Sequence, residues 1–154
     1  MISKIIRNPE PLETFFIPEK IIHREKQIRD IFTSVILPLK NGIGSSAFVY
    51  GQSGTGKTAT MKRIMGSENE IHIFYENAIS ISSFKKVMGD LAYSMGISIE
   101  GKFSYESVFR SIERIRNKNV LLIVDESLNL IRKDFEGLYT IMRAGELFGS
   151  SIGT

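Results

Sequence analysis

Two kinds of hydrophobic pattern alternate along the chain. In the first kind, apolar residues recur every three or four positions or the composition is helical, which predicts helices at residues 25–39, 57–65, 84–95, 104–115 and 135–147. In the second kind, short runs are apolar throughout, which is typical of strands buried in a parallel sheet. These runs predict strands at residues 47–50, 71–75 and 120–124. Because strands alternate with helices, the pattern predicts an α/β fold in which helices flank a parallel sheet.

The first twenty residues differ from the rest of the chain. They hold three of the four prolines, Pro9, Pro11 and Pro18, and proline fixes the backbone angle φ and removes an amide donor. The total length of 154 residues corresponds to about one domain. We therefore expect an extended arm over residues 1–20, followed by one folded domain over residues 21–154.

Composition excludes several classes of protein. With 42% hydrophobic and 24% charged residues, the chain is not a disordered polyelectrolyte. The longest strongly apolar stretch without charge or glycine, residues 31–39, is far shorter than the roughly 20 residues that span a bilayer. The chain contains no cysteine, so disulfides are excluded and a cytoplasmic location is expected, without a membrane partner. A net charge of +3 is compatible with a nucleic-acid partner but does not require one.

A glycine-rich motif lies between the predicted strand at 47–50 and the helix that follows it. Residues 51–58, Gly-Gln-Ser-Gly-Thr-Gly-Lys-Thr, satisfy the P-loop pattern in full. Such a loop turns its backbone amides toward phosphate oxygens, its lysine neutralises the β- and γ-phosphates, and its last threonine is a ligand of Mg²⁺. The expected nucleotide-binding residues are Gly51, Gly54, Thr55, Gly56, Lys57, Thr58 and Ala59.

Two carboxylates follow the most apolar of the predicted strands. Asp125 and Glu126 come directly after residues 120–124, at the carboxyl end of the strand, where ligands bind in open α/β sheets. We expect Asp125 to hold Mg²⁺ through water and Glu126, together with Lys57, to be catalytic, with Glu126 polarising the attacking water. A solvated acidic pair that ends the strand is the alternative interpretation.

The combination of these motifs resembles the archaeal relatives of the origin-recognition and cell-division-control replication initiators, within the AAA+ ATPases. The similar segments are residues 16–25, 47–60, 99–104 and 120–126, with 138–143 downstream. The family usually has an apolar residue and a second acid after its Asp-Glu pair, whereas Ser127 and Leu128 stand here.

The resemblance implies further site residues. Ile22, His23 and Arg24 correspond to the family segment that lies against the adenine, although a histidine at a helix start is often a cap or a surface residue. Lys102 and Phe103 lie in the turn that initiators insert between two helices to contact duplex DNA. A cation there would meet phosphate, and an apolar group would enter the minor groove.

The resemblance also implies a strand order of 5-1-4-3-2, in which strand four separates the P-loop strand from the strand of Asp125. Residues 150–154 look like the approach to strand four, so we expect a partial AAA+ domain that is incomplete at its C-terminus, without the sensor residues, the lid and the winged helix. We expect this chain alone to be inactive as an ATPase and at best marginally folded, because a missing strand leaves ladder groups unpaired.

The predicted function is that of the ATP-binding module of a replication initiator. It would bind ATP or ADP with Mg²⁺, and the full-length protein would recognise duplex origin DNA and assemble with other initiator subunits or the replicative helicase. Two alternatives remain open. One is a regulatory or signalling P-loop ATPase that switches a protein partner. The other is a small P-loop kinase, in which the strand of Asp125 would neighbour the P-loop strand directly.

Overall fold

The structure is a computed structural model that describes residues 21–98, 103–114, 119–143 and 152–153. Three strands are present in this part of the chain: β1 (His72–Asn77), β2 (Val120–Asp125) and β3 (Ile152–Gly153). The α-helices are α1 (Glu25–Ile31), α2 (Leu37–Lys40), α3 (Lys57–Ser67), α4 (Phe84–Ser94), α5 (Tyr105–Arg114), α6 (Leu128–Lys133) and α7 (Phe135–Met142). A π-helical segment, Phe32–Ile36, joins α1 to α2, and a 3₁₀ turn, Ala78–Ser80, follows β1.

The strands form one parallel sheet in the order β1-β2-β3. β1 and β2 pair along their full length, from His72 opposite Val120 to Asn77 opposite Asp125. β3 pairs with β2 only at Val120 and Leu121, on the edge opposite β1. The carboxyl ends of β1 and β2 therefore lie side by side, as the parallel α/β prediction requires.

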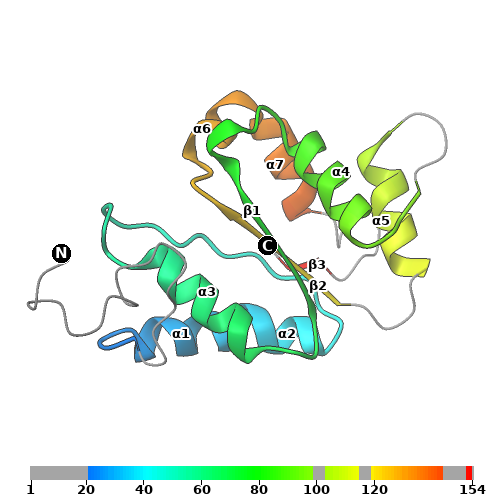
Figure 1. Cartoon of the computed structure of the whole chain (residues 1–154). Coiled ribbons are helices and arrows are strands. Elements are labelled where there is room, and N and C mark those ends of the chain that lie inside the picture. The colour runs from blue at the N-terminus through cyan, green and yellow to red at the C-terminus, as the bar shows by residue number, and fades with distance from the viewer. Residues whose placement is uncertain (1–20, 99–102, 115–118, 144–151, 154) are drawn as a thin grey trace, which may run out of the picture.

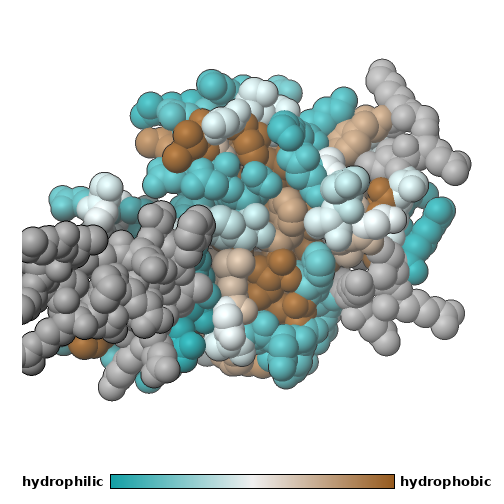
Figure 2. All heavy atoms as spheres, viewed as in Figure 1, coloured by the Kyte–Doolittle hydropathy of each residue, from teal (hydrophilic) through white to brown (hydrophobic). Residues whose placement is uncertain are grey.

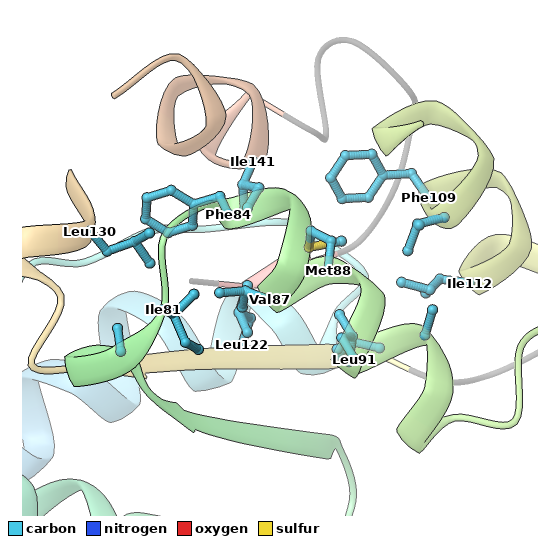
Figure 3. Close-up of a cluster of buried hydrophobic side chains, with 14 residues drawn as sticks. Ile81, Phe84, Val87, Met88, Leu91, Phe109, Ile112, Leu122, Leu130 and Ile141 are labelled. Carbon is cyan, nitrogen blue, oxygen red and sulfur yellow. The ribbon is translucent and has the colours of Figure 1, made fainter. Parts of the chain in front are cut away.

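Helices cover both faces of the sheet (Figure 1). α1, α2 and α3 lie on one face, where buried residues of these helices pack against Leu121 and Ile123 of β2. α4, α5, α6 and α7 lie on the other face, and their buried side chains pack against Val120 and Leu122 (Figure 3). Alternate residues of β2 thus enter two separate cores, because successive side chains of a strand point to opposite faces. A fully apolar strand is the direct consequence.

Most of the predicted elements are confirmed. The strands predicted at 71–75 and 120–124 correspond to β1 and β2, and the helices predicted from 57, 84, 104 and 135 correspond to α3, α4, α5 and α7. Ser104 caps α5 as expected, since its Oγ accepts from the amide of Ser107 at 3.1 Å. The expected arm over residues 1–20 and the end of the last helix near residue 147 lie outside the described residues.

The strand predicted at residues 47–50 is wrong. These residues have no regular secondary structure, and Phe48 and Tyr50 are 59% and 93% exposed. Among the residues that the structure describes, no strand pairs with this segment, and residues 46–49 line a cavity of about 150 Å³ together with residues of β2. Figure 2 shows apolar atoms gathered at the middle of the molecular face, between the two helical layers seen in Figure 1. An apolar run without a pairing partner stays irregular, since a strand is stabilised by its ladder.

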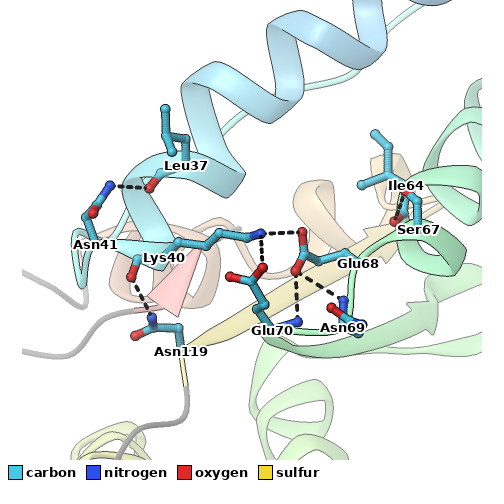
Figure 4. Close-up of polar contacts among 9 residues, drawn as sticks. All are labelled: Leu37, Lys40, Asn41, Ile64, Ser67, Glu68, Asn69, Glu70 and Asn119. Carbon is cyan, nitrogen blue, oxygen red and sulfur yellow. Dashed lines mark hydrogen bonds and ion pairs between the residues drawn. The ribbon is translucent and has the colours of Figure 1, made fainter.

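A polar cluster connects α2 to the segments that lead into the amino ends of β1 and β2 (Figure 4). The ammonium of Lys40 lies 3.0 Å from a carboxylate oxygen of Glu68 and 3.2 Å from one of Glu70. The backbone carbonyl of Lys40 accepts a hydrogen bond from the side-chain amide of Asn119 at 3.4 Å. Burial raises the pKa of Glu68, but hydrogen bonds from the amides of Glu70 and Asn69 and from Lys40 outweigh it, so the net pKa lies below its ordinary value. Glu68 is therefore held in its ionised form.

No helix in the part of the chain that the structure describes combines the length and the apolar character needed to cross a membrane.

Candidate nucleotide-binding site

The P-loop runs from Gly51 into the first turn of α3. Gly54 and Gly56 have φ angles of 77° and 82°, in the left-handed region that side chains disfavour. Gly56 is the N-cap of α3, so the amides of the next residues point out of the helix without intrahelical partners. This arrangement is an anion-binding helix N-terminus preceded by a glycine turn.

The lysine of the motif lies over this loop. Its ammonium donates to the carbonyl oxygens of Gly51 and Gln52, each at 2.9 Å. The hydroxyl of Thr55 donates to the Gln52 carbonyl at 2.8 Å and closes the turn. The side chain of Lys57 is thus directed back toward the start of the loop. Ala59, half-buried, follows in the first turn of α3.

The two predicted metal ligands meet at the carboxyl end of β2. The hydroxyl of Thr58 donates to Oδ2 of Asp125 at 2.6 Å, although the residues are 67 positions apart in sequence. The phenol of Tyr75, on the neighbouring strand β1, donates to the same oxygen at 2.8 Å. The amide of Glu126 donates to Oδ1 at 2.9 Å. The carboxylate of Asp125 is therefore held by three donors from three parts of the chain.

These contacts shift the pKa values of Asp125 and Tyr75. Burial raises the pKa of Asp125, whereas the hydrogen bonds just described and the charge of Lys57 lower it, and the net pKa lies below its ordinary value. Burial, together with the hydrogen bond to Asp125, raises the pKa of Tyr75 to about 12. At neutral pH the site holds an ionised carboxylate beside neutral hydroxyls. One carboxylate and one hydroxyl are the protein ligands that suit Mg²⁺ when phosphates complete its coordination.

Glu126 has an unusual backbone conformation. Its φ of 53° lies in the left-handed region, and its side chain is exposed. Strained residues of this kind cluster at functional sites when the surrounding structure fixes them. The turn separates the two acids, so that Asp125 faces α3 while Glu126 lies in solvent next to it.

In the part of the segment before α1 that the structure describes, Arg24 contacts the P-loop. The guanidinium of Arg24 donates to the carbonyl of Thr55 in the P-loop. Ile22 and His23 are exposed at the start of α1, and His23 has a left-handed φ of 63°. The structure thus brings Arg24 to the site, while the side chains of Ile22 and His23 lie open to solvent.

The two residues expected to contact DNA are described only in part. Lys102 lies outside the described residues. Phe103 is half-buried and packs against the core formed by α4 and α5, and the ammonium of Lys85 lies 5.5 Å from the centre of its ring. In this structure the ring of Phe103 is directed toward the protein.

A cavity of about 150 Å³ adjoins the site. Lys57, Asp125 and Ser127 line it together with the apolar residues 47–49 and Leu121–Val124 of β2. The residue that sequence reasoning missed is Tyr75. No motif marks it: its position follows from the parallel register, which places Asn77 beside Asp125, with Tyr75 two residues earlier on the same face.

The parallel sheet, the glycine turn before α3 and the contact between Thr58 and Asp125 define a P-loop nucleotide-binding fold of the Walker type. The AAA domain family matches residues 43–152, which is most of the chain. The chain therefore belongs to the AAA domain family.

Within this family the chain is similar to archaeal replication initiators. A Thermoplasma acidophilum protein described as an ORC1-type DNA replication protein 1 is 38% identical over 134 residues, which cover 85% of this chain and 39% of that protein. The ORC1-type DNA replication protein 1 of Archaeoglobus fulgidus is 32% identical, over 97% of this chain and 40% of that protein. The chain thus spans about two fifths of the length of these curated relatives.

Solved structures agree with this assignment. Cdc6p from Pyrobaculum aerophilum superposes with a TM-score of 0.76 at 21% identity, over 95% of this chain and 42% of that chain. The Aeropyrum pernix ORC1 protein, solved in complex with DNA, gives a TM-score of 0.73 at 25% identity, over 99% of this chain and 43% of that chain. The resemblance to the archaeal origin-recognition initiators and the AAA+ fold class are confirmed.

Proposed function

We propose that this chain is the ATP-binding module of a DNA replication initiator that recognises duplex origin DNA. In this proposal, ATP or ADP binds with Mg²⁺, and the bound nucleotide controls assembly with other initiator subunits or the replicative helicase. The contact of 2.6 Å between Thr58 and Asp125, which joins the P-loop helix to the strand of the acidic pair, supports the nucleotide-binding part of the proposal. The similarity to ORC1-type replication proteins supports the initiator part.

The roles of the residues follow from their chemistry. Backbone amides of the glycine turn and the start of α3 bind phosphate oxygens, and Lys57 neutralises their charge. Thr58 and Asp125 would hold Mg²⁺, which when bound would supply positive charge beside the phosphates. Glu126 accepts a proton from the attacking water. Arg24 holds the P-loop through the carbonyl of Thr55.

The kinase alternative requires residues 47–50 to pair with β2. In the described residues β2 instead has β1 on one edge and β3 on the other, which is the arrangement expected when another strand separates the P-loop segment from β2. The similarity to initiators, one of them solved with DNA, favours the initiator over a signalling ATPase. Duplex DNA contact by this chain is part of the proposal.

Nucleotide binding is tested with Lys57→Ala. The variant removes a charge-assisted contact, which is expected to weaken ATP binding by roughly 10-fold to 100-fold. Isothermal titration calorimetry in the presence of Mg²⁺ measures the affinity. Lys133→Ala, at an exposed position of α6, is the matched control and should bind as the unaltered chain does. Equal affinities for the two variants would contradict the assignment of Lys57.

A further inference from the structure

Tyr75 lies in the candidate metal site without belonging to any of its motifs. Its phenol donates to Oδ2 of Asp125 at 2.8 Å, and its ring is half-buried in the core beneath α3. A phenol hydroxyl that is withdrawn from water requires a partner, because an unsatisfied buried donor costs about 1 to 3 kcal/mol. A phenylalanine would fill the same apolar space, so packing alone does not account for the hydroxyl.

The geometry of the sheet explains how this residue reaches the carboxylate. Tyr75 is opposite Ile123, so Asp125 lies two residues further along the paired strand, a rise of about 7 Å. A tyrosine side chain spans such a distance along the face of a sheet, whereas serine and threonine are too short. The phenol approaches from β1, while the other side-chain donor, Thr58, approaches from α3.

The two donors act differently on the carboxylate. Thr58 belongs to the P-loop helix and would be a direct ligand of Mg²⁺, so its contact with Asp125 is part of the metal site itself. Tyr75 is anchored in the sheet and donates a neutral hydrogen bond, so it fixes the orientation of Asp125 without adding a cation that would repel the metal. Second donors of this kind orient metal ligands and strengthen metal binding.

We propose that Tyr75 is a positioning residue that aims the carboxylate of Asp125 at the Mg²⁺ of a bound nucleotide. This inference rests on the proposed nucleotide function and extends it to a residue outside the Walker motifs. Its consequence is specific: the hydroxyl of Tyr75 contributes to the affinity that Mg²⁺ adds, and not to the binding of nucleotide without metal.

The test compares Tyr75→Phe with Tyr93→Phe in the 154-residue chain. Both variants remove one phenol hydroxyl, but Tyr93 is 88% exposed on α4, within the opposite helical layer. The affinity for a non-hydrolysable ATP analogue is measured by calorimetry with saturating Mg²⁺ and again with EDTA. The gain from Mg²⁺ is the ratio of the affinity with Mg²⁺ to the affinity with EDTA. We expect this gain to fall about tenfold in Tyr75→Phe, because the variant loses one hydrogen bond to a charged group. Binding in EDTA should be unchanged, and Tyr93→Phe should equal the unaltered chain.

Each other result has a defined meaning. An unchanged Mg²⁺ gain in Tyr75→Phe overturns the positioning role and leaves the proposed function standing. An equal loss with Mg²⁺ and with EDTA also overturns it, because it identifies a general structural role. Absence of nucleotide binding by the unaltered chain overturns the proposed function and this inference together. As a further check, Tyr75→Phe should lose its effect on the Mg²⁺ gain in an Asp125→Asn background, since the two changes remove the same contact.

Discussion

The carboxylate of Asp134 joins the first turns of two helices in the layer formed by α4–α7. Its Oδ2 accepts from the amide of Phe84 at 2.7 Å, and its Oδ1 accepts from the amide of Gly137 at 3.0 Å. Both amides lie in the first turn of their helices, α4 and α7, where no intrahelical carbonyl is available. One side chain thus satisfies two helix N-termini and fixes their distance from each other.

The cost of removing this side chain follows from the two contacts. Loss of a helix cap costs about 1 kcal/mol, with a range of roughly 0.5 to 2. Phe84 is 2% exposed, so its amide lies beside a buried side chain and has little access to replacement water. We therefore expect Asp134→Ala to lower the free energy of unfolding by about 2 to 3 kcal/mol. This corresponds to a change of roughly 30-fold to 150-fold in the unfolding equilibrium constant.

Urea unfolding followed by far-ultraviolet circular dichroism measures this loss. The slope m, the change of the unfolding free energy with urea concentration, should be unchanged if the folded and unfolded states keep their compactness. Asp134→Asn retains one acceptor oxygen and should lose about half as much. Asp30→Ala is the matched control, because Asp30 is exposed within α1 and caps no helix. If Asp134→Ala unfolds at the same urea concentration as Asp30→Ala, the carboxylate does not stabilise the two helix starts and the reasoning fails.

Three further predictions concern catalysis, pH and DNA. Glu126→Gln should bind ATP as the unaltered chain does. In an initiator assembly that hydrolyses ATP, this change should abolish turnover, because an amide accepts no proton from water. Phosphate release measures turnover, and equal rates for the variant and the unaltered protein would remove Glu126 from catalysis. The lowered pKa of Glu68 stabilises the fold above its ordinary pKa of about 4.3, and this contribution disappears as the pH falls through the lower folded value. Urea unfolding between about pH 5 and pH 2 should therefore show a shallower decline for Glu68→Gln, and parallel declines would contradict it. Lys102→Glu should weaken binding to duplex DNA, most strongly at low salt; fluorescence anisotropy measures it, and unaltered affinity at low salt would exclude this turn as a contact.

The helices and the central strands could be predicted from the sequence because local pattern and tertiary packing agree there. Residues 120–124 are apolar without interruption, since β2 sends alternate side chains into two cores. The helix predicted from residue 25 continues to Lys40, but its middle is a π-helical segment. Pro38 lacks an amide, and the hydroxyls of Thr33 and Ser34 donate to carbonyls one turn earlier. Periodicity does not report such local competition for hydrogen bonds.

α6 and Tyr75 show what pattern alone does not reveal. Helix α6 spans only six residues, Leu128–Lys133, too few to show a period, and it is held by burial of Leu130 in the core. The motifs predicted Thr58 and Asp125 separately, and their meeting could be expected because a P-loop helix and a Walker strand share one end of the sheet. The third member, Tyr75, depends on the register between β1 and β2, which is a property of the folded sheet.

Residues 47–50 are apolar in sequence, but the strand predicted there is wrong. Residues 47–49 line the cavity beside β2, yet Phe48, Val49 and Tyr50 are all exposed, so this run is not buried as a core strand is. What is absent in the described residues is a pairing partner, because β3 occupies the edge of β2 only at Val120 and Leu121. Residues 46–50 are exposed, so their polar backbone groups are within reach of water. The P-loop therefore keeps its place in this structure through α3, through Arg24 and through the contact of Thr58 with Asp125, and not through a strand before it. Nucleotide affinity should accordingly depend more on the junction between α3 and β2 than on the segment that leads into the loop.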